Sequence, residues 1–290
     1  MNLDDDILKK FYRQRSEKAK KYDHGSVLVI GGSRIYSGSP ALAAFSALRG
    51  GADIVQVAAP RRAADIVAGF SPDLITYPLD GKCLSDEHLS RLLEITEAMK
   101  VVSNGRLAVV IGGGAGRREE TKKLIRNYLK EISLPTVVDA DGIYAFENEG
   151  EDIIDESLVF TPHLYEFFVL TGKKLDNLSL EKRKEAVKRE AATIDGTILL
   201  KGPTDIISDG SRVLLNDFPV PELTAGGCGD TLAGLVGALL ARDEGLEAVA
   251  GAAYLNTRAG QLAAEEMGDS LIAEDLIEKI PRAIDESIDK

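Results

Sequence analysis

Residues 223–231 read LTAGGCGDT and run directly into the apolar pattern of a predicted helix. Three glycines in this stretch, Gly226, Gly227 and Gly229, leave backbone N–H groups uncovered by side chains. The helix that follows adds its own unpaired N-terminal donors and the positive end of its dipole. The stretch therefore predicts an anion site that suits a phosphate group.

Asp230 stands at or next to the start of this predicted helix. A carboxylate at such a place is often a plain N-cap, which remains one interpretation. A helix needs only one cap, however, and not three neighbours without side chains. A base beside bound phosphates is suited to removing the proton of a hydroxyl that attacks phosphorus. We therefore interpret Asp230 as a candidate catalytic base.

Strands alternate with helices along the chain, which predicts an α/β fold with a doubly wound, mostly parallel sheet and helices on both faces. A charged surface helix is expected over residues 3–20, and the stretch 71–78 is undecided. An Asp-Gly turn predicts a hairpin over residues 206–215, beside the main sheet. Strands of the main sheet are expected at residues 26–30, 53–59, 107–111, 135–142, 158–160 and 197–200.

In such a sheet the ligand lies outside the carboxyl ends of the strands. Five of the predicted strands end in polar or glycine-rich loops, so these loops are expected at one edge of the sheet. The loops comprise residues 31–33, 112–114, 139–141, 161–166 and 201–202.

The composition limits the classes of protein to consider. The chain has 290 residues, 44% of them hydrophobic, and a formal net charge of −12, which disfavours nucleic acid or an anionic membrane as partner. Cys83 and Cys228 are too few and too far apart for a disulfide framework or a zinc site. The acidic N-terminus has no signal-like apolar core, and no apolar run approaches membrane-spanning length. A cytoplasmic protein is expected.

Two common nucleotide-binding motifs are missing from the chain. There is no Gly-x-x-x-x-Gly-Lys-Ser/Thr sequence, which excludes a P-loop nucleotidase. The turn at Gly31-Gly32 lacks the third glycine and the ribose-binding acid of a dinucleotide fingerprint. What remains is a phosphate-binding glycine loop near the C-terminus, preceded by a Lys-Gly strand end and several acidic strand ends.

Six motifs occur in a specific order along the chain. They are GGS at 31–33 with GSPALAA at 38–44, IGGG at 111–114, VDADG at 138–142, TPHxxE at 161–166, LKG at 200–202 and GGCGD at 226–230. A single Gly-Gly-x-Gly-Asp would indicate only a sugar or vitamin kinase. The six together resemble the ADP-dependent NAD(P)H-hydrate dehydratases of the ribokinase-like superfamily, over about residues 25–281. The resemblance implies that residues 1–290 form a single ribokinase-like catalytic domain without a fused epimerase domain.

The resemblance also implies an activity. Enzymes of this family dehydrate the 6S hydrate of NADH or NADPH while ADP becomes AMP and phosphate, with Mg²⁺. Hydroxide is a poor leaving group, so phosphorylation of the ring hydroxyl makes the elimination easy. By analogy, Asp230 takes the hydroxyl proton, and the N–H groups around Gly227 and Gly229 stabilise the transferred phosphoryl group.

The family's binding positions carry over to this chain residue by residue. The hydrate-binding positions are Pro40, Gly114, His163 and Asp230. The nucleotide-binding positions, for ADP or AMP, are Lys201, Gly202, Pro203, Thr204, Asp205 and Gly229. The resemblance further suggests a homotetramer and a separate epimerase in the same pathway.

Several of these side chains also have ordinary structural interpretations. Glu166 could simply belong to a first helical turn, and its functional alternative is to orient Mg²⁺ or its waters. Asp139 could cap a helix, but together with Asp141 it could instead contact Mg²⁺ or the substrate ribose. Lys201 could be a solvated strand end, although a contact with the nucleotide phosphates is the better hypothesis. The pairs 61–62 and 117–118 are arginines that would ordinarily be solvated, but either could meet a second phosphate group of the substrate.

Two other functions stay open at this point. A related kinase of a small alcohol, such as a thiazole or pyrimidine vitamin precursor, would release a stable phosphate ester instead of free phosphate. A nucleotide-binding regulator without turnover would not need Asp230.

Overall fold

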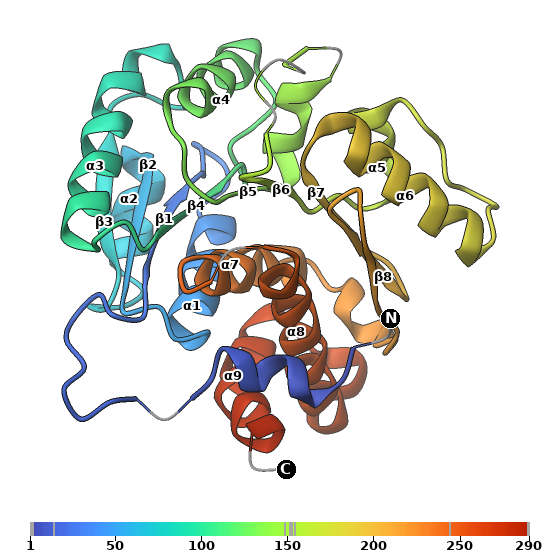
Figure 1. The fold of residues 1–290 in the computed structure, drawn as a ribbon. Helices are drawn as coiled ribbons and strands as arrows, with labels where there is room; N and C mark the ends of the chain where they lie inside the picture. The colour runs from blue at the N-terminus through green and yellow to red at the C-terminus, as the bar shows by residue number, and fades with distance from the viewer. Residues whose placement is uncertain are drawn as a thin grey trace.

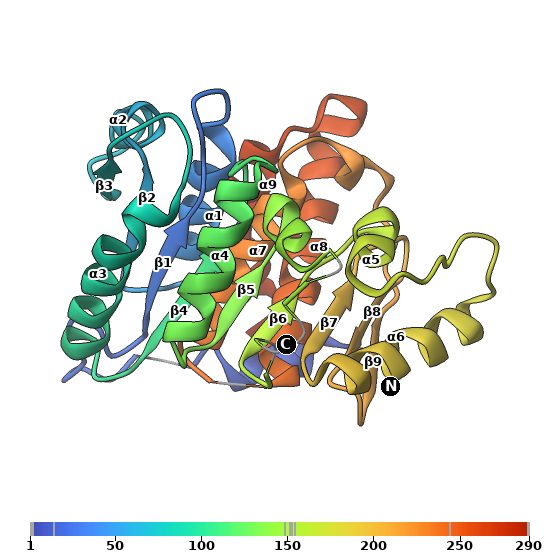
Figure 2. The same cartoon turned by 90° about the horizontal axis from the view of Figure 1, so that it is seen from above.

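The computed structural model describes residues 3–13, 15–147, 149–150, 153, 155–243 and 245–288. It contains a nine-stranded sheet with the strand order β3-β2-β1-β4-β5-β6-β7-β8-β9 (Figure 1). Strands β1 to β7 are parallel, and β8 and β9 complete one edge in antiparallel pairing (Figure 2). The strands are β1 Ser26–Ile30, β2 Ile54–Pro60, β3 Ile75–Leu79, β4 Leu107–Ile111, β5 Thr136–Val138, β6 Leu158–Phe160, β7 Thr197–Leu200, β8 Asp205–Ser208 and β9 Val213–Asn216.

Helices cover both faces of the sheet, as predicted (Figure 1). The α-helices are α1 Gly38–Arg49, α2 Arg61–Ala68, α3 Leu89–Val102, α4 Glu119–Glu131, α5 Leu164–Thr171, α6 Leu180–Ile194, α7 Cys228–Leu240, α8 Leu246–Met267 and α9 Ala273–Ile288. The 3₁₀ helices are η1 Asp5–Lys10, η2 Asp86–His88, η3 Ala140–Phe146, η5 Pro221–Thr224 and η6 Gly268–Ser270. Within the described ranges, no helix combines the length and the apolar character needed to cross a bilayer.

The alternation of side chains along the strands divides the core into two layers. In β1, Val27 and Val29 pack into the cluster formed with α1, α7, α8 and α9, whereas Leu28 and Ile30 join α3 and α4. Because successive side chains of a strand point to opposite faces, a strand buried on both faces must be apolar at every position. This explains why the parallel strands read as continuous apolar runs.

The strand order reverses at β1, with β2 on one side and β4 on the other. Such a switch point leaves a crevice at the carboxyl ends of the two strands. The loops after β1 and β4 meet there, because Gly32 N–H donates to the Gly113 carbonyl at 2.8 Å. A Cβ on Gly31 would lie 2.4 Å from the same oxygen, so only glycine permits this approach.

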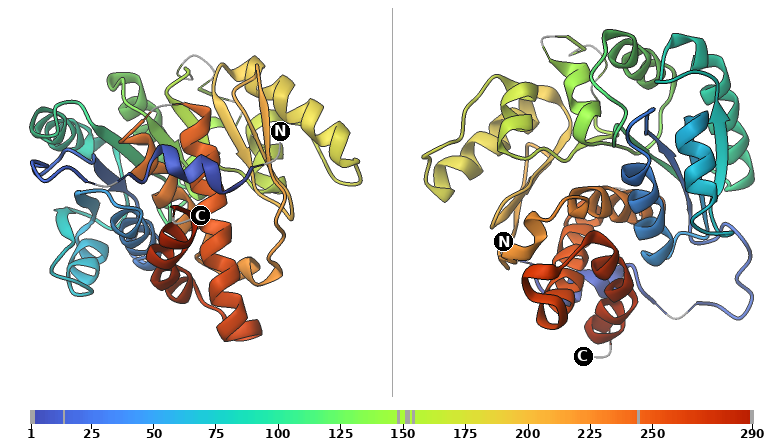
Figure 3. Two further views of the ribbon diagram at one scale, coloured as in Figure 1. Left: turned by 60° about the horizontal axis from the view of Figure 1, so that its bottom comes forward. Right: turned by 180° about the vertical axis from the view of Figure 1, so that it is seen from behind.

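The N-terminal segment differs from the prediction. Instead of a helix over residues 3–20, the structure has the short η1, which packs on α8 and α9 (Figure 3). Ile7 and Leu8 are buried there, but residues 15–21 are charged or small and offer no apolar face to bury. Helix formation depends on such a face, so the charged pattern alone was insufficient.

Three further features of the structure differ from the sequence predictions or extend them. The undecided stretch contains β3, an edge strand in which Pro78 is tolerated because one side needs no ladder hydrogen bond. The hairpin of β8 and β9 does not stand beside the sheet but extends it through pairing with β7. Helix α7 begins at Cys228, two residues before Asp230, so Asp230 lies in its first turn and Gly227 occupies the N-cap position.

Candidate active site

The N-terminus of α7 is shaped by Gly227. This residue has φ +98°, and a Cβ on it would lie 2.6 Å from Leu42 Cδ1, so both backbone conformation and packing demand glycine. Gly227 has no side chain to cap the helix, and the first backbone N–H groups of a helix lack intrahelical partners. Cys228 and Gly229 line a cavity at this point. The arrangement offers the cavity backbone donors and a positive dipole end.

The side chain of Asp230 lies between α7 and the loop after β4. A Cβ built on Gly113 would be 3.0 Å from Asp230 Oδ1, and the Ser39 hydroxyl donates a hydrogen bond to the carboxylate. Burial, reinforced by the nearby charge of Asp139, raises the pKa of Asp230 to about 7, although Ser39 and Lys201 act in the opposite direction. A carboxyl with this pKa is suited to general base catalysis near neutral pH.

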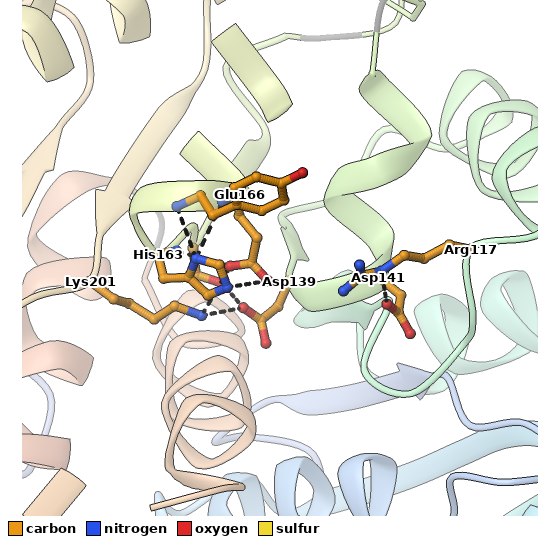
Figure 4. A network of polar contacts seen from close by, with 8 residues as sticks. Arg117, Asp139, Asp141, His163, Glu166 and Lys201 are labelled. Carbon is orange, nitrogen blue, oxygen red and sulfur yellow. Dashed lines mark hydrogen bonds and ion pairs between the residues drawn. The ribbon is translucent and has the colours of Figure 1, made fainter. Parts of the chain in front are cut away.

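Lys201 brings together the ends of β5, β6 and β7. Its Nζ lies 2.9 Å from Asp139 Oδ1 and 3.8 Å from Glu166 Oε2 (Figure 4). Thr161 donates to the same Asp139 oxygen at 2.6 Å. Burial opposes the charge of Lys201, but Asp139, Glu166 and Asp230 outweigh it and raise the pKa of the lysine. Lys201 is therefore a permanent cation and not a solvated strand end.

His163 and Glu166 form a reciprocal cap at the start of α5. The His163 Nδ1 accepts from the Tyr165 and Glu166 N–H groups at 3.1 and 3.3 Å, and Glu166 Oε2 accepts from the His163 N–H at 2.9 Å. Figure 4 shows the imidazole beside Glu166 and Lys201. His163 also lines the cavity, so a structural cap and a ligand contact are compatible in one residue.

The cavity at the α7 N-terminus has a volume of about 650 Å³. One part of its wall is apolar and comes from Phe218, Val220, Leu223 and Leu232, while Lys201 lies in the wall with the glycine loop. An apolar wall beside a cation and backbone donors suits a nucleotide, with a flat base on one side and phosphates on the other.

Four of the residues predicted to bind nucleotide in the stretch 201–205 line this cavity: Lys201, Gly202, Pro203 and Asp205. Asp205 accepts from the Gly202 N–H at 3.0 Å and from Asn216 Nδ2 at 2.9 Å, which fixes the turn after β7. Burial raises the pKa of Asp205 to about 6. Thr204 is absent from the lining and donates to Asp217 instead, at 2.5 Å.

The two remaining predicted substrate positions lie on the other side of Asp230. Gly114 has φ +64°, and a Cβ there would approach Tyr36 Cβ to 2.7 Å. Pro40 is buried in α1, with its Cγ 3.2 Å from where a Cβ of Gly32 would lie. Its neighbour Ser39 is the residue that reaches Asp230.

The carboxylates predicted as magnesium ligands are already occupied by a cation. Asp139 and Glu166 are both buried, and both lie within 4 Å of Lys201. The part of the chain that the structure describes holds no group of three or more His, Cys, Asp or Glu side chains arranged for a metal ion. These residues do not form an all-protein Mg²⁺ cage. Mg²⁺ commonly relies on substrate phosphates and water with only one or two carboxylates, so the assignment of Asp139 and Glu166 stays a prediction.

The arginine pairs also have structural partners. Arg61 pairs with Asp80 at 2.7 Å. Arg117 donates to Asp141 at 2.7 Å (Figure 4). Its guanidinium also lies 3.8 Å from the centre of the Tyr144 ring. Asp141 therefore anchors the loop after β4 and does not contribute to the Lys201 cluster.

Some residues of the site were not singled out in the sequence. Ser39 bonds the candidate base, Thr161 bonds Asp139, and Asn216 fixes Asp205. Ser39 and Thr161 lie inside quoted motifs and could have been selected by position. Asn216, on β9, has no local signal, because only the sheet pairing brings it to Asp205.

Comparison with known proteins gives consistent results over nearly the whole chain. A family model described as NAD(P)H-hydrate dehydratase matches residues 27–282. The ADP-dependent (S)-NAD(P)H-hydrate dehydratase of Cenarchaeum symbiosum is 37% identical over 280 residues, covering 96% of this chain and 95% of that protein. The bifunctional NAD(P)H-hydrate repair enzyme Nnr of Pyrobaculum aerophilum is 42% identical, covering 93% of this chain and 52% of its own length. The chain thus spans about half the length of the bifunctional relatives.

The fold has clear counterparts among solved structures. The ADP/ATP-dependent NAD(P)H-hydrate dehydratase of Bacillus subtilis, co-crystallised with ATP/Mg²⁺, matches with a TM-score of 0.80 and 23% identity, covering 98% of this chain and 97% of the other. A ribokinase-like superfamily protein of Enterococcus faecalis gives a TM-score of 0.85. These likenesses establish a ribokinase-like fold. The chain belongs to the NAD(P)H-hydrate dehydratase family.

Proposed function

We propose that this chain dehydrates the 6S hydrate of NADH or NADPH and that ADP supplies the phosphoryl group, giving NAD(P)H, AMP and phosphate. The observation that carries the proposal is the position of Asp230. Its carboxylate has a pKa of about 7 and lies at the α7 N-terminus, next to Gly113 on one side and near Lys201 on the other. The family membership supplies the substrate class.

The reaction proceeds in two steps at this site. Asp230 accepts the proton of the hydrate's ring hydroxyl while the hydroxyl oxygen bonds to the β-phosphorus of ADP and the bond to AMP breaks. The phosphate then leaves with the C–O electron pair and takes up the proton that the adjacent ring carbon loses. The N–H groups at Gly227 and Gly229 and the charge of Lys201 stabilise the phosphoryl group in transit.

The nucleotide occupies the cavity of about 650 Å³ in this proposal. Its base packs among Phe218, Val220 and Leu223, and its phosphates reach Lys201 and Gly229. Gly202, Pro203, Thr204 and Asp205 form the turn beside the ribose. Asp139 and Glu166 are the carboxylates that would hold Mg²⁺ together with the phosphates, and the ion would supply positive charge to neutralise them.

The hydrate approaches from the side of Pro40 and Gly114, two of the positions that the family resemblance assigns to substrate. His163, a third such position, contacts it from the wall of the nucleotide cavity. We further propose that residues 1–290 act as one catalytic domain, that a homotetramer is the assembly, and that epimerisation of the 6R hydrate takes place at a separate epimerase site.

The test is to incubate the protein with NADH hydrate, ADP and Mg²⁺ and to follow the return of the nicotinamide absorbance. We expect NADH, AMP and free phosphate in equal amounts, and the Asp230→Asn variant serves as the inactive control. A stable phosphate ester in place of free phosphate would identify a small-alcohol kinase instead. No recovery with ADP or ATP would rule out the proposed activity.

A further inference from the structure

A second cleft, of about 670 Å³, opens between the loop after β1 and the loop after β4. It shares no lining residue with the nucleotide cavity. The lining consists of Ser33, Arg34, Ile35, Tyr36, Lys82, Cys83, Ala115, Gly116, Arg117 and Arg118. Four of these ten residues are cationic and none is acidic, in a chain whose formal charge is −12.

Two of the four cations keep their charge uncompensated. Arg117 is paired with Asp141 at 2.7 Å, and Arg118 with Glu120 at 3.3 Å. Arg34 makes no ion pair with any residue that the structure describes, and the same is true of Lys82. Their loops are joined, because the Arg34 N–H donates to the Lys82 carbonyl at 2.9 Å. This hydrogen bond joins the two segments that carry the unpaired cations of the cleft.

The cleft begins next to the candidate base. Tyr36, in its wall, lies so close to Gly114 that a Cβ there would approach it to 2.7 Å. The preceding residue, Gly113, is the one whose Cβ would lie 3.0 Å from Asp230 Oδ1. A substrate with its ring hydroxyl at Asp230 can therefore extend over this loop into the cleft without crossing the nucleotide cavity.

The proposed substrate requires such a site, because it is much larger than its reacting ring. A nicotinamide dinucleotide carries a doubly charged pyrophosphate, and its phosphorylated form also has a 2′-phosphate. Cations in a concave site recognise phosphate strongly, and arginine does so with two parallel hydrogen bonds. Ile35 and Tyr36 are 78% and 55% exposed, which gives the distal base an apolar surface on which to stack.

We propose that this cleft binds the phosphate groups of the dinucleotide substrate through Arg34 and Lys82, with Arg117 and Arg118 in the same lining, and leaves the ADP in the separate cavity. The inference rests on the proposed function, since it concerns the substrate of the same active site. Arg34 is the sharper probe, because Lys82 also lines an adjoining hollow that contains Asp80, Asp86, Glu87 and Glu120.

The test compares Arg34→Ala with Arg49→Ala, an exposed arginine at the other end of α1 that changes the net charge equally. We measure kcat and KM for NADH hydrate and NADPH hydrate separately, and binding of NADH and NADPH by fluorescence without ADP. Loss of one charge-assisted contact should raise KM and Kd roughly tenfold in Arg34→Ala with little change in kcat. Arg34→Lys should recover part of the loss, and Arg49→Ala should match the wild type.

The two substrates separate the two phosphate sources. An equal loss for both hydrates assigns Arg34 to the pyrophosphate, and a loss confined to NADPH hydrate assigns it to the 2′-phosphate; either supports the inference. Unchanged KM and Kd for both substrates in Arg34→Ala would overturn it, even with turnover intact. If the protein has no turnover but still binds the dinucleotide in a way that depends on Arg34, then the proposed activity fails and the inference about the cleft stands.

Discussion

Asp230 lies at a helix N-terminus, which favours the charged form of its carboxylate. It is also buried beside other carboxylates, and both effects disfavour the charged form. The burial prevails, and the pKa of about 7 follows. At the residue scale this balance has two measurable consequences, one for turnover and one for stability.

The first prediction concerns the pH dependence of turnover. A base must be deprotonated to act, so kcat/KM should fall about tenfold for each pH unit below about 7 and level off above it. The pH profile of kcat/KM reports this titration in the free enzyme. An acidic limb near pH 4 would show that the pKa of the base is not raised in the free enzyme.

The variant Asp230→Asn tests the same role of Asp230 in a second way. It should lower kcat by at least about 10²-fold, since general base catalysis contributes about that much.

The second prediction concerns stability. Because the pKa of Asp230 is raised on folding from 3.8 to about 7, the folded protein holds a proton between these pH values that the unfolded chain has released. Stability from this group is therefore complete below about pH 4 and is lost as the pH rises to about 7. Asp230→Asn should melt like the wild type at pH 4 and be more stable at pH 8, by on the order of 2–4 kcal/mol.

Thermal melts at several pH values check the stability prediction, with Asp285→Asn, an exposed carboxylate on α9, as the matched control. A difference between Asp230→Asn and wild type that stays constant with pH would contradict it. If Asp230→Asn gains stability at high pH and loses turnover, the charged carboxylate of Asp230 destabilises the fold in exchange for activity.

At the scale of the element, the start of α7 contains two kinds of glycine: one that the fold requires and one that leaves space for a ligand. Gly227 has a positive φ, and a Cβ on it would lie 2.6 Å from Leu42 and 2.9 Å from Ala273, whereas a Cβ on Gly226 would meet no protein atom within 4 Å. Side-chain space at Gly226 is therefore open to the ligand, and at Gly227 it is filled by the protein.

The third prediction follows from this difference. Gly227→Ala should lose roughly 1–3 kcal/mol of stability, because alanine must adopt the strained backbone and displace Leu42. Gly226→Ala should keep its stability. Gly229→Ala, whose Cβ would lie 3.5 Å from Lys201 Nζ, should have the same free energy of unfolding as the wild type but a higher KM for ADP. Urea denaturation and ADP kinetics separate the effects; a stable Gly227→Ala would show that the backbone here relaxes freely.

The elements also show what the sequence could predict. Parallel strands were recognisable because burial on both faces makes each one an unbroken apolar run ending in a glycine or polar loop. The η1 segment was not, since its extent depends on contact with α8 and α9. Strand β3 was obscured by Pro78, whose tolerance depends on the edge position that only the strand order reveals.

The same division holds for the site. Asp230, Lys201 and His163 lie at strand or helix ends that motifs mark, and their proximity follows from the parallel sheet. The partners that set their protonation and position are contributed by other elements, as with Ser39 on α1 and Thr161 after β6. A single sequence does not indicate such pairs, because each contact joins segments separated by many residues.

At the scale of the whole molecule, the nucleotide cavity joins two parts of the core. Asp205 and Asn216 come from the antiparallel edge of the sheet, while Cys228, Leu232 and Asn256 come from α7 and α8. The edge strands pack in a cluster with α5 and α6, and the helices belong to the main cluster under the sheet. A nucleotide in this cavity should therefore hold the edge hairpin against the helical layer.

The fourth prediction is that ADP stabilises the protein unevenly. At about 100 times Kd, ADP should add about 2.7 kcal/mol, because it binds the folded chain alone. For a chain of 290 residues this corresponds to a rise in Tm of roughly 4 °C. Hydrogen exchange should slow most in β8, β9 and the first turn of α7 and should change least in β3, at the opposite edge of the sheet. Sodium chloride at matched ionic strength controls for ionic effects. Equal protection of β3 and β9 would mean that ADP tightens the molecule globally, and no shift at saturation would exclude this cavity as the nucleotide site.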